Sequence, residues 1–248
     1  MIRLNMIVEG QTEETFVRDV LTDHLVSFEV YPYARRVETG RKRIRTTSGR
    51  GRRVFRGGMT SYLKAKGDIL RWIKQEAHSP NVFVTTMFDL YALPEDFPGF
   101  GAAMAKPTAA ARVQALEEEL AKDVSFSRFI PYIQLHEFEA LVLADPPKLA
   151  PRFELQATDR PIQELTALVQ CTPPEEIDDG DQTAPSKRII KAIPEYDGVK
   201  SSAGPQIVQA IGLENIRAKC PHFDSWLRQL EAIGTKHPHN QITKENRQ

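Results

Sequence analysis

The chain has 248 residues, 41% of them hydrophobic and 27% charged, with a formal net charge of +0 at pH 7. These values are typical of one large globular domain or of one domain with a small addition, and a balanced charge does not by itself imply a polyanionic partner. Two isolated cysteines, Cys171 and Cys220, exclude a disulfide framework and a cysteine zinc site. No apolar run approaches the roughly 18 residues of a membrane span, and no leader is evident, so we expect a cytoplasmic protein with no membrane partner.

The chain begins with an apolar run, from about Arg3 to Glu9, that ends in a carboxylate followed by a glycine. A helix capped by Thr12 should follow, because apolar residues recur at helical spacing as far as Leu25. This strand–turn–helix unit places Glu9 at the carboxyl end of a strand, where ligands bind in open α/β sheets. Glu13, one helical turn further on, is expected to face the same crevice.

A second strand is expected from Phe28 to Ala34, and a strongly basic segment, residues 35–58, comes after it. Glu38 is the only acid among its closely spaced bases, which are Arg35, Arg36, Arg41, Lys42, Arg43, Arg45, Arg50, Arg52, Arg53 and Arg56. The absence of apolar periodicity predicts a flexible loop or long hairpin. Two interpretations remain open: a solvated insertion, or a surface that contacts nucleic-acid phosphates, for which arginine is well suited.

Two further strands are expected to end near acids. A helix from Thr60 to Ala77 precedes the run Val82–Asp89, which is almost continuously apolar, as in a strand buried on both faces, and ends in a carboxylate. A long loop and a helix over residues 107–122 follow. The next strand, Arg128 to Leu135, contains Pro131, which favours a sheet edge or a bulge. It leads directly into a helix that begins with His136, Glu137, Phe138 and Glu139.

Strands and helices thus alternate in the first part of the chain, which predicts an α/β domain over residues 1–145. Its mostly parallel sheet should have about four strands, with helices on both faces and all strand carboxyl ends at one edge. Residues 146–233 should form a helical region packed on that domain, with helices near 161–170, 185–193, 204–211, 213–219 and 222–233. Residues 234–248 are polar and are expected to fray.

Four acids, Glu9, Asp89, Glu137 and Glu139, lie at or just after predicted strand ends. Any one alone would more often be a helix cap or a turn residue. Several at one edge would repel one another, which a fold tolerates best when a cation lies between them. Oxygen ligands favour Mg²⁺ or Mn²⁺. Such an ion recruits phosphates, so these acids, with Glu13 beside them, predict metal-dependent phosphoryl transfer; His136 is expected to be satisfied by hydrogen bonds.

A second candidate phosphate site is the segment Ser186-Lys187-Arg188, which follows Pro185 at an expected helix start. Bases in the first helical turn oppose the helix dipole, and a bound anion would offset that cost. The alternative, a surface helix with exposed bases, is equally compatible with the sequence.

Four sequence blocks resemble a known family: Val-Glu-Gly-Gln-Thr-Glu-Glu from Val8, Phe-Asp-Leu-Tyr-Ala-Leu-Pro from Phe88, Leu-His-Glu-Phe-Glu-Ala-Leu from Leu135, and Thr-Ala-Pro-Ser-Lys-Arg from Thr183. The first two resemble the Toprim domain, the metal-binding fold of topoisomerases, primases and overcoming-lysogenization-defect nucleases. All four together resemble DUF4276, a bacterial family of stand-alone Toprim-like proteins. The resemblance implies a Toprim-like fold and, more loosely, association with ATPases and a role in defence against foreign DNA.

The resemblance assigns Glu9 the role of the Toprim glutamate, a ligand or general acid/base, and Asp89 that of the first aspartate of Asp-x-Asp. Tyr91 replaces the second aspartate, so Glu13, Glu137 or Glu139 would have to complete a metal shell. We expect a metal-dependent nuclease or related phosphoryl-transfer protein that acts on nucleic acid, DNA rather than RNA. The alternative is a catalytically silent Toprim-like binding module with a partner ATPase. The oligomeric state stays open, a homodimer included, and nucleotide binding without nucleic acid lacks a glycine-rich phosphate loop.

Overall fold

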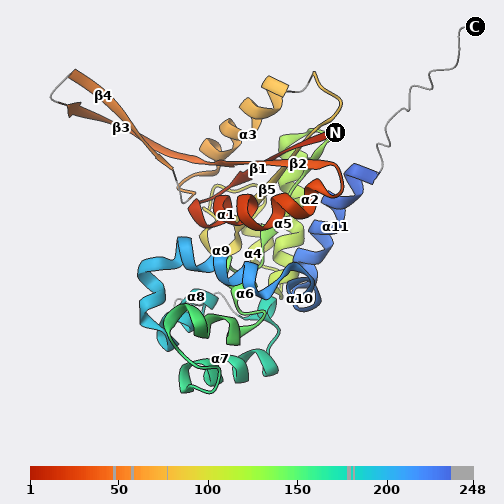
Figure 1. Cartoon of the computed structure of the whole chain (residues 1–248). Helices are drawn as coiled ribbons and strands as arrows, with labels where there is room; N and C mark the ends of the chain where they lie inside the picture. Colours follow the sequence, from red (N-terminus) through yellow and green to blue (C-terminus); the bar gives the residue numbers. More distant parts are fainter. Residues whose placement is uncertain (47–48, 57–58, 77, 178–179, 181, 236–248) are drawn as a thin grey trace, which may run out of the picture.

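A parallel β-sheet forms the centre of the computed structural model, which describes residues 1–46, 49–56, 59–76, 78–177, 180 and 182–235 (Figure 1). Its strands lie in the order β2-β1-β5-β6, and β7 also pairs with β5. They are β1 (Ile2–Val8), β2 (Val30–Arg36), β5 (Val82–Asp89), β6 (Phe129–Ile130) and β7 (Ile133–Gln134), and every pairing is parallel. The predicted α/β class and parallel sheet are confirmed, with five strands in place of about four.

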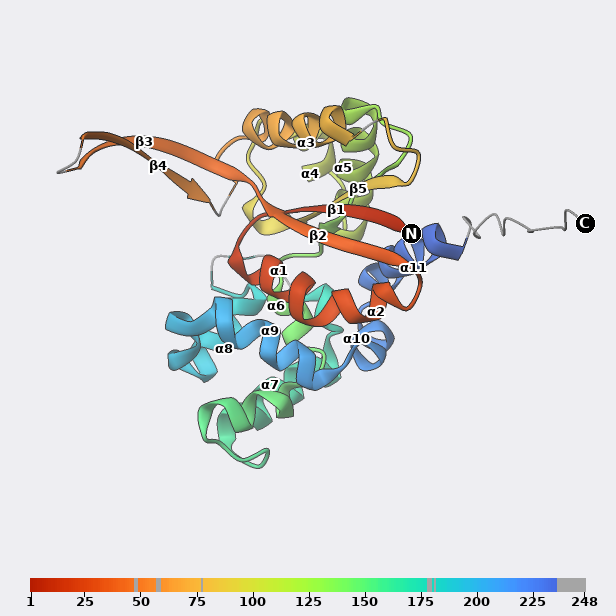
Figure 2. The same ribbon diagram turned by 45° about the horizontal axis from the view of Figure 1, so that its top comes forward.

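Helices cover both faces of this sheet (Figure 2). The helical elements on one face are α1 (Gln11–Phe16), a π-helical turn (Val17–Leu21), α2 (Thr22–Val26) and α11 (Pro221–Thr235). The helices on the other face are α3 (Tyr62–Glu76), α4 (Phe100–Met104) and α5 (Ala109–Val124). Strand β5 contributes Met87 to one core and its neighbour Phe88 to the other, because successive side chains point to opposite faces. Burial on both faces explains why this strand is almost continuously apolar in sequence.

The C-terminal part of the chain is helical, as predicted. A short 3₁₀ turn, Leu90–Ala92, directly follows β5 and belongs to the sheet region. The elements of the C-terminal part, before α11, are α6 (Glu139–Val142), Pro146–Phe153 (3₁₀), α7 (Arg160–Cys171), Pro174–Glu176 (3₁₀), α8 (Pro185–Ala192), Pro194–Val199 (3₁₀), α9 (Lys200–Ile211) and α10 (Leu213–Lys219). Apolar residues of this region, such as Ile189 and Val208, belong to the same buried cluster as Leu4 of β1. In the described part of the chain, no helix is both long enough and apolar enough to cross a membrane. The predicted frayed tail lies largely outside the described residues.

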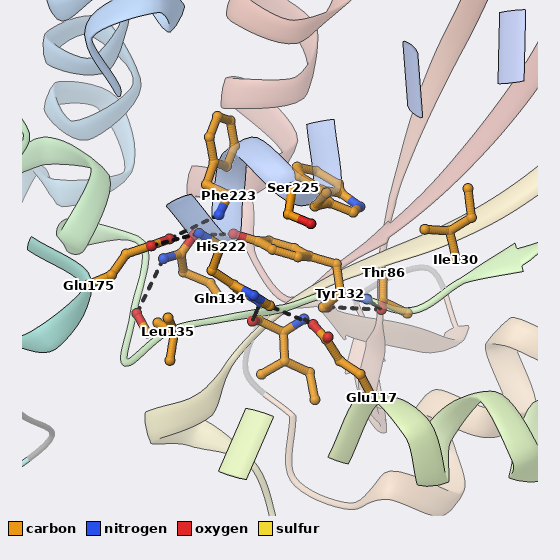
Figure 3. Close-up of polar contacts among 12 residues, drawn as sticks. Thr86, Glu117, Ile130, Tyr132, Gln134, Leu135, Glu175, His222, Phe223 and Ser225 are labelled. Carbon is orange, nitrogen blue, oxygen red and sulfur yellow. Dashed lines mark hydrogen bonds and ion pairs between the residues drawn. The ribbon is translucent and has the colours of Figure 1, made fainter. Parts of the chain in front are cut away.

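The strand predicted over Arg128 to Leu135 is divided into β6 and β7, because Pro131 and Tyr132 interrupt the pairing with β5. The Thr86 hydroxyl bridges the gap: it accepts a hydrogen bond from the Tyr132 N–H (2.9 Å) and donates one to the Tyr132 carbonyl (3.0 Å) (Figure 3). The Tyr132 ring is buried and stacks on Trp226 of α11, with ring centroids 4.2 Å apart. A side-chain hydroxyl therefore replaces ladder bonds that the proline position cannot supply.

Two carboxylates, from a 3₁₀ turn and from α5, hold the start of α11 in place (Figure 3). Glu175 accepts hydrogen bonds from the N–H groups of His222 (2.9 Å) and Phe223 (3.0 Å), in the first turn of the helix. The His222 ring nitrogen Nε2 lies 3.0 Å from the Ile133 carbonyl oxygen and 3.2 Å from Glu117 of α5. Although burial opposes it, the carboxylate of Glu117 contributes most to raising the pKa of His222 above its ordinary value. The His222 ring thus links helices from opposite faces of the sheet.

The outer strand β2 carries a proline at a position that costs no hydrogen bond. Its bonds to β1 come from odd-numbered positions: the Ile2 N–H donates to the Glu29 carbonyl (2.9 Å), and the Val37 N–H donates to the Val8 carbonyl (3.0 Å). In the alternating pattern of a strand, even-numbered Pro32 therefore has its nitrogen on the outer edge. A missing N–H at that position also weakens the edge as a template for another strand.

The basic segment forms a two-stranded antiparallel hairpin, β3 (Glu38–Thr46) and β4 (Gly49–Arg56), as one of the two predicted conformations has it. Figures 1 and 2 show this hairpin extending well away from the rest of the molecule. Its pairing starts at Glu38↔Arg56 and ends at Thr46↔Gly49.

Replacing Gly234 with alanine is expected to destabilise the protein by about 1–3 kcal/mol or more, because a Cβ at that position would lie 1.8 Å from the Phe28 backbone oxygen. Either α11 or the chain entering β2 would have to shift. A matched control is Gly67→Ala in α3, where a Cβ would meet no atom within 4 Å. That change should stabilise by about 0.5–1 kcal/mol, since alanine is the better helix former. Urea unfolding of both variants measures the difference, and equal stabilities would contradict the close packing of α11 against the backbone at Phe28.

Candidate functional site

Glu9 lies directly after β1, at the carboxyl edge of the sheet, and is 8% exposed. Its Oε1 accepts a hydrogen bond from the Met59 N–H (3.1 Å), and its Oε2 accepts one from the Asp89 N–H (3.3 Å). The carboxylate therefore joins three segments: the end of β1, the end of β5 and the residue that follows the hairpin. Burial raises the pKa of Glu9 above its ordinary value, while these two backbone donors act to lower it.

Glu13 faces the same pocket from the first turn of α1 and is buried. Its Oε2 accepts a hydrogen bond from the Gly10 N–H (2.7 Å), which closes a capping arrangement at the start of the helix. A Cβ at position 10 would lie 3.1 Å from that oxygen, so glycine fits this close approach. Burial, followed by the charge of Glu9, raises the pKa of Glu13 to about 7. The predicted convergence of Glu9 and Glu13 is therefore observed.

Asp89 is the last residue of β5, beside Glu9. Its Oδ1 is buried and has no hydrogen-bond partner among the described residues. Burial raises the pKa of Asp89 well above its ordinary value, and four acids add to the effect: Glu13, Glu9, Glu139 and Glu137. The charges of all four other predicted acids thus act on Asp89, so the five carboxyl groups lie near one another at the carboxyl edge of the sheet.

Glu137 and Glu139 enter the pocket through an unusual turn between β7 and α6. His136, at this turn, has a φ of 61°, a left-handed conformation uncommon for a non-glycine residue. The Glu137 carboxylate accepts hydrogen bonds from both the N–H and the hydroxyl of Ser186, at the start of α8. Glu139 accepts one from the Tyr196 hydroxyl (3.3 Å). Burial and then the charge of Glu137 raise the pKa of Glu139 to about 8, against the opposing effect of Lys200.

The predicted second phosphate site is arranged differently from expectation. The anion at the amino end of α8 is the protein's own Glu137, because both donors of the buried Ser186 point to that carboxylate. Arg188 donates from Nε to the Thr183 carbonyl (3.0 Å), and Lys187 is half-buried beside it. Phosphate binding by Lys187 and Arg188 stays a prediction. The observed anion at this helix end is the carboxylate of Glu137.

Tyr91, which stands where the resemblance leads one to expect a second aspartate, is an exposed residue. It belongs to the 3₁₀ turn after β5, its N–H donates to the His136 carbonyl (2.8 Å), and it is 41% exposed. No sequence pattern predicted three groups that the structure adds: the Met59 N–H, the Tyr196 hydroxyl and the Lys200 ammonium. Each comes from a segment distant in the chain from the acid that it contacts or affects.

The donor set fits a hard divalent cation, because it consists of carboxylate oxygens and includes the unpartnered Oδ1 of Asp89. Within the described residues, however, no three histidine, cysteine, aspartate or glutamate side chains are already arranged to hold a metal ion. The acids therefore have suitable chemistry for a cation without a preformed cage.

The fold and the position of the acids define an α/β protein with a parallel sheet and a group of interacting acids at its carboxyl edge. The family model described as "Domain of unknown function (DUF4276)" matches residues 8–231, and the chain belongs to this family. The matched range includes all five acids.

Two solved structures are similar to the chain, both of the C-terminal region of the OLD protein of Xanthomonas campestris pv. campestris. The one phased with platinum has a TM-score of 0.44 and 14% identity, over 95% of this chain and 96% of that chain. The one phased with iodine has a TM-score of 0.41 and 16% identity, over 96% and 99%. No curated protein matches the chain.

Proposed function

We propose that the chain is a divalent-cation-dependent phosphoryl-transfer protein of the nuclease class, acting on nucleic acid at a Toprim-like site. The observation that carries the proposal is the gathering of four buried acids, Glu9, Glu13, Glu137 and Glu139, beside Asp89 at the carboxyl edge of a parallel sheet, where the charge of each raises the pKa of Asp89. Repulsion among buried acids destabilises a fold unless protons or a cation neutralise them. Because these acids destabilise the fold, their presence together is better explained by binding of a ligand than by a contribution to stability.

The cation would be Mg²⁺ or Mn²⁺, held by Asp89 and Glu9 with Glu13, Glu137 or Glu139 drawn inward. When bound, it would polarise a phosphate oxygen and lower the pKa of an attacking water. Glu9 is oriented by two backbone donors, and Asp89 offers its free Oδ1. Glu13, whose pKa is about 7, is suited to accept or donate a proton near neutral pH.

A titration of the purified protein with Mn²⁺ at pH 7, followed by calorimetry in two buffers of different ionisation enthalpy, tests the proposal. We expect binding with release of about one proton or more per ion, because a cation displaces protons from groups of raised pKa. The same protein should then cleave end-labelled DNA with Mn²⁺ and not with EDTA. Failure to bind any divalent cation would refute the proposal.

A second candidate function is a catalytically silent binding module that partners an ATPase. Tyr91 favours the silent module, because it stands at the position of the second Toprim aspartate and can supply no carboxylate to a cation. Cation binding without cleavage of any nucleic acid would support this candidate over the nuclease.

A further inference from the structure

The hairpin β3–β4 starts and ends at the rim of the acid pocket. At one foot, the Val37 N–H donates to the carbonyl of Val8, the residue before Glu9. At the other foot, the Met59 N–H donates to Glu9 itself. Both Val37 and Met59 are buried in the core on the α3 side of the sheet. Both ends of the hairpin are thus anchored beside Glu9, so a ligand bound along the hairpin would extend to the acids.

The register of the hairpin separates its bases unequally between its two faces. In an antiparallel pair, directly opposed positions share a face, and successive positions alternate. The opposed pairs Arg43↔Arg52 and Arg45↔Arg50 therefore share one face with position 41, also arginine. The other face has only two bases, at the opposed pair Lys42↔Arg53, together with Ile44, Thr46, Phe55 and three glycines. Glu38, opposed to Arg56 at the foot of the hairpin, is the only acid in residues 38–56, so an external polyanion is the natural counterpart of the arginine face further out.

The dimensions of the hairpin match duplex DNA. Its eight opposed pairs span about 26 Å at roughly 3.3 Å per residue. That length corresponds to about eight base pairs at roughly 3.4 Å each. The major groove of B-form DNA admits a two-stranded β-ribbon, whereas the deep, narrow major groove of A-form RNA does not.

We infer that the hairpin is a duplex-gripping arm: its arginine face lies in the major groove of B-form DNA and delivers a phosphate about eight base pairs away to the acid pocket. This inference rests on the proposed function for the last step only. Binding by the arm requires no cation and no chemistry. The substrate class is therefore double-stranded DNA, in preference to duplex RNA or single strands.

The test measures binding of a fluorescent 20-base-pair DNA duplex by anisotropy in EDTA, so that a failure of the proposed chemistry cannot affect it. Arg43→Gln with Arg52→Gln removes two charges from the arginine face. Lys42→Gln with Arg53→Gln removes two charges from the neighbouring opposed pair on the other face. At 0.1 M salt the first variant should bind roughly 50-fold more weakly, with a salt slope reduced by about 2, since each phosphate contact contributes about 0.9. The second should lose less than about threefold.

Equal losses from the two variants would overturn the inference, because they would show a general charge effect and no oriented face. So would equal affinity of the parent for duplex RNA or single-stranded DNA of the same length. Shorter duplexes give an independent readout: affinity should rise steeply up to about eight base pairs, and a flat dependence from six base pairs upward would contradict the match in length. Thermal unfolding of both variants should equal that of the parent, since the substitutions lie on the projecting hairpin.

Discussion

Asp89→Asn and Glu9→Gln should each lower Mn²⁺-dependent cleavage of DNA by on the order of 10²–10³-fold, the usual effect of removing one group that stabilises a transition state. Both substitutions keep the size of the side chain and remove one negative charge. Asp89 provides the buried oxygen without a partner, and Glu9 connects the ends of β1 and β5. The rate of cleavage at saturating Mn²⁺, together with the Mn²⁺ affinity, separates loss of the ion from loss of the chemistry.

Glu14→Gln is the matched control for this prediction. Glu14 is adjacent to Glu13 on the same helix, but its carboxylate pairs with Arg36 (2.8 Å) and it lies outside the group of acids that acts on Asp89. The same charge is removed a few ångströms away, so cleavage should change by less than about threefold. A comparable loss in all three variants would point to general electrostatics and would count against a cation held by Glu9 and Asp89.

Raising the pH from 6 to 9 without divalent cations should destabilise the protein by on the order of a few kcal/mol. The folded-state pKa is about 7 for Glu13 and about 8 for Glu139, both above the ordinary 4.5 that applies on unfolding. The folded state therefore holds protons that the unfolded state releases. This contribution is fully present below about pH 4.5 and is lost as the pH rises through 7 to 8. The free energy of unfolding in urea, measured across this range, reports it directly.

Two comparisons isolate the acid pocket as the cause. Glu139→Gln keeps an acceptor for the Tyr196 hydroxyl and removes the titrating group, so stability should fall less steeply between pH 7 and 9. Adding Mn²⁺ to the parent at pH 9 should restore stability, because a ligand that binds only the folded state stabilises it. If the stability of the parent is the same at pH 6 and pH 9, or if Mn²⁺ does not change it, then the carboxyl groups do not repel one another as inferred.

Local sequence patterns were sufficient to predict much of the fold. The run Val82–Asp89 was predicted with the same bounds as β5, because a strand buried on both faces is recognisable from its continuous apolar character. The helix predicted over residues 107–122 corresponds to α5, and the hydroxyl of Thr108 caps its start by accepting the Ala111 N–H (3.2 Å). The strand over Arg128 to Leu135 was wrong as one element. Its pattern is continuous, but Pro131 cannot donate to the ladder, and the Thr86 hydroxyl that bridges the break lies 46 residues away.

The sequence by itself determined at which edge of the sheet the acids lie, because the right-handed crossovers of a parallel sheet bring strand carboxyl ends to one edge. Only the tertiary structure decided what each acid does there. Glu137 caps α8 from 49 residues away, and Glu9 accepts the Met59 N–H from 50 residues away. Such bonds join segments whose separation in the chain leaves no periodicity, and the depth of burial that raises the pKa of Asp89 exists only after both faces of the sheet are covered.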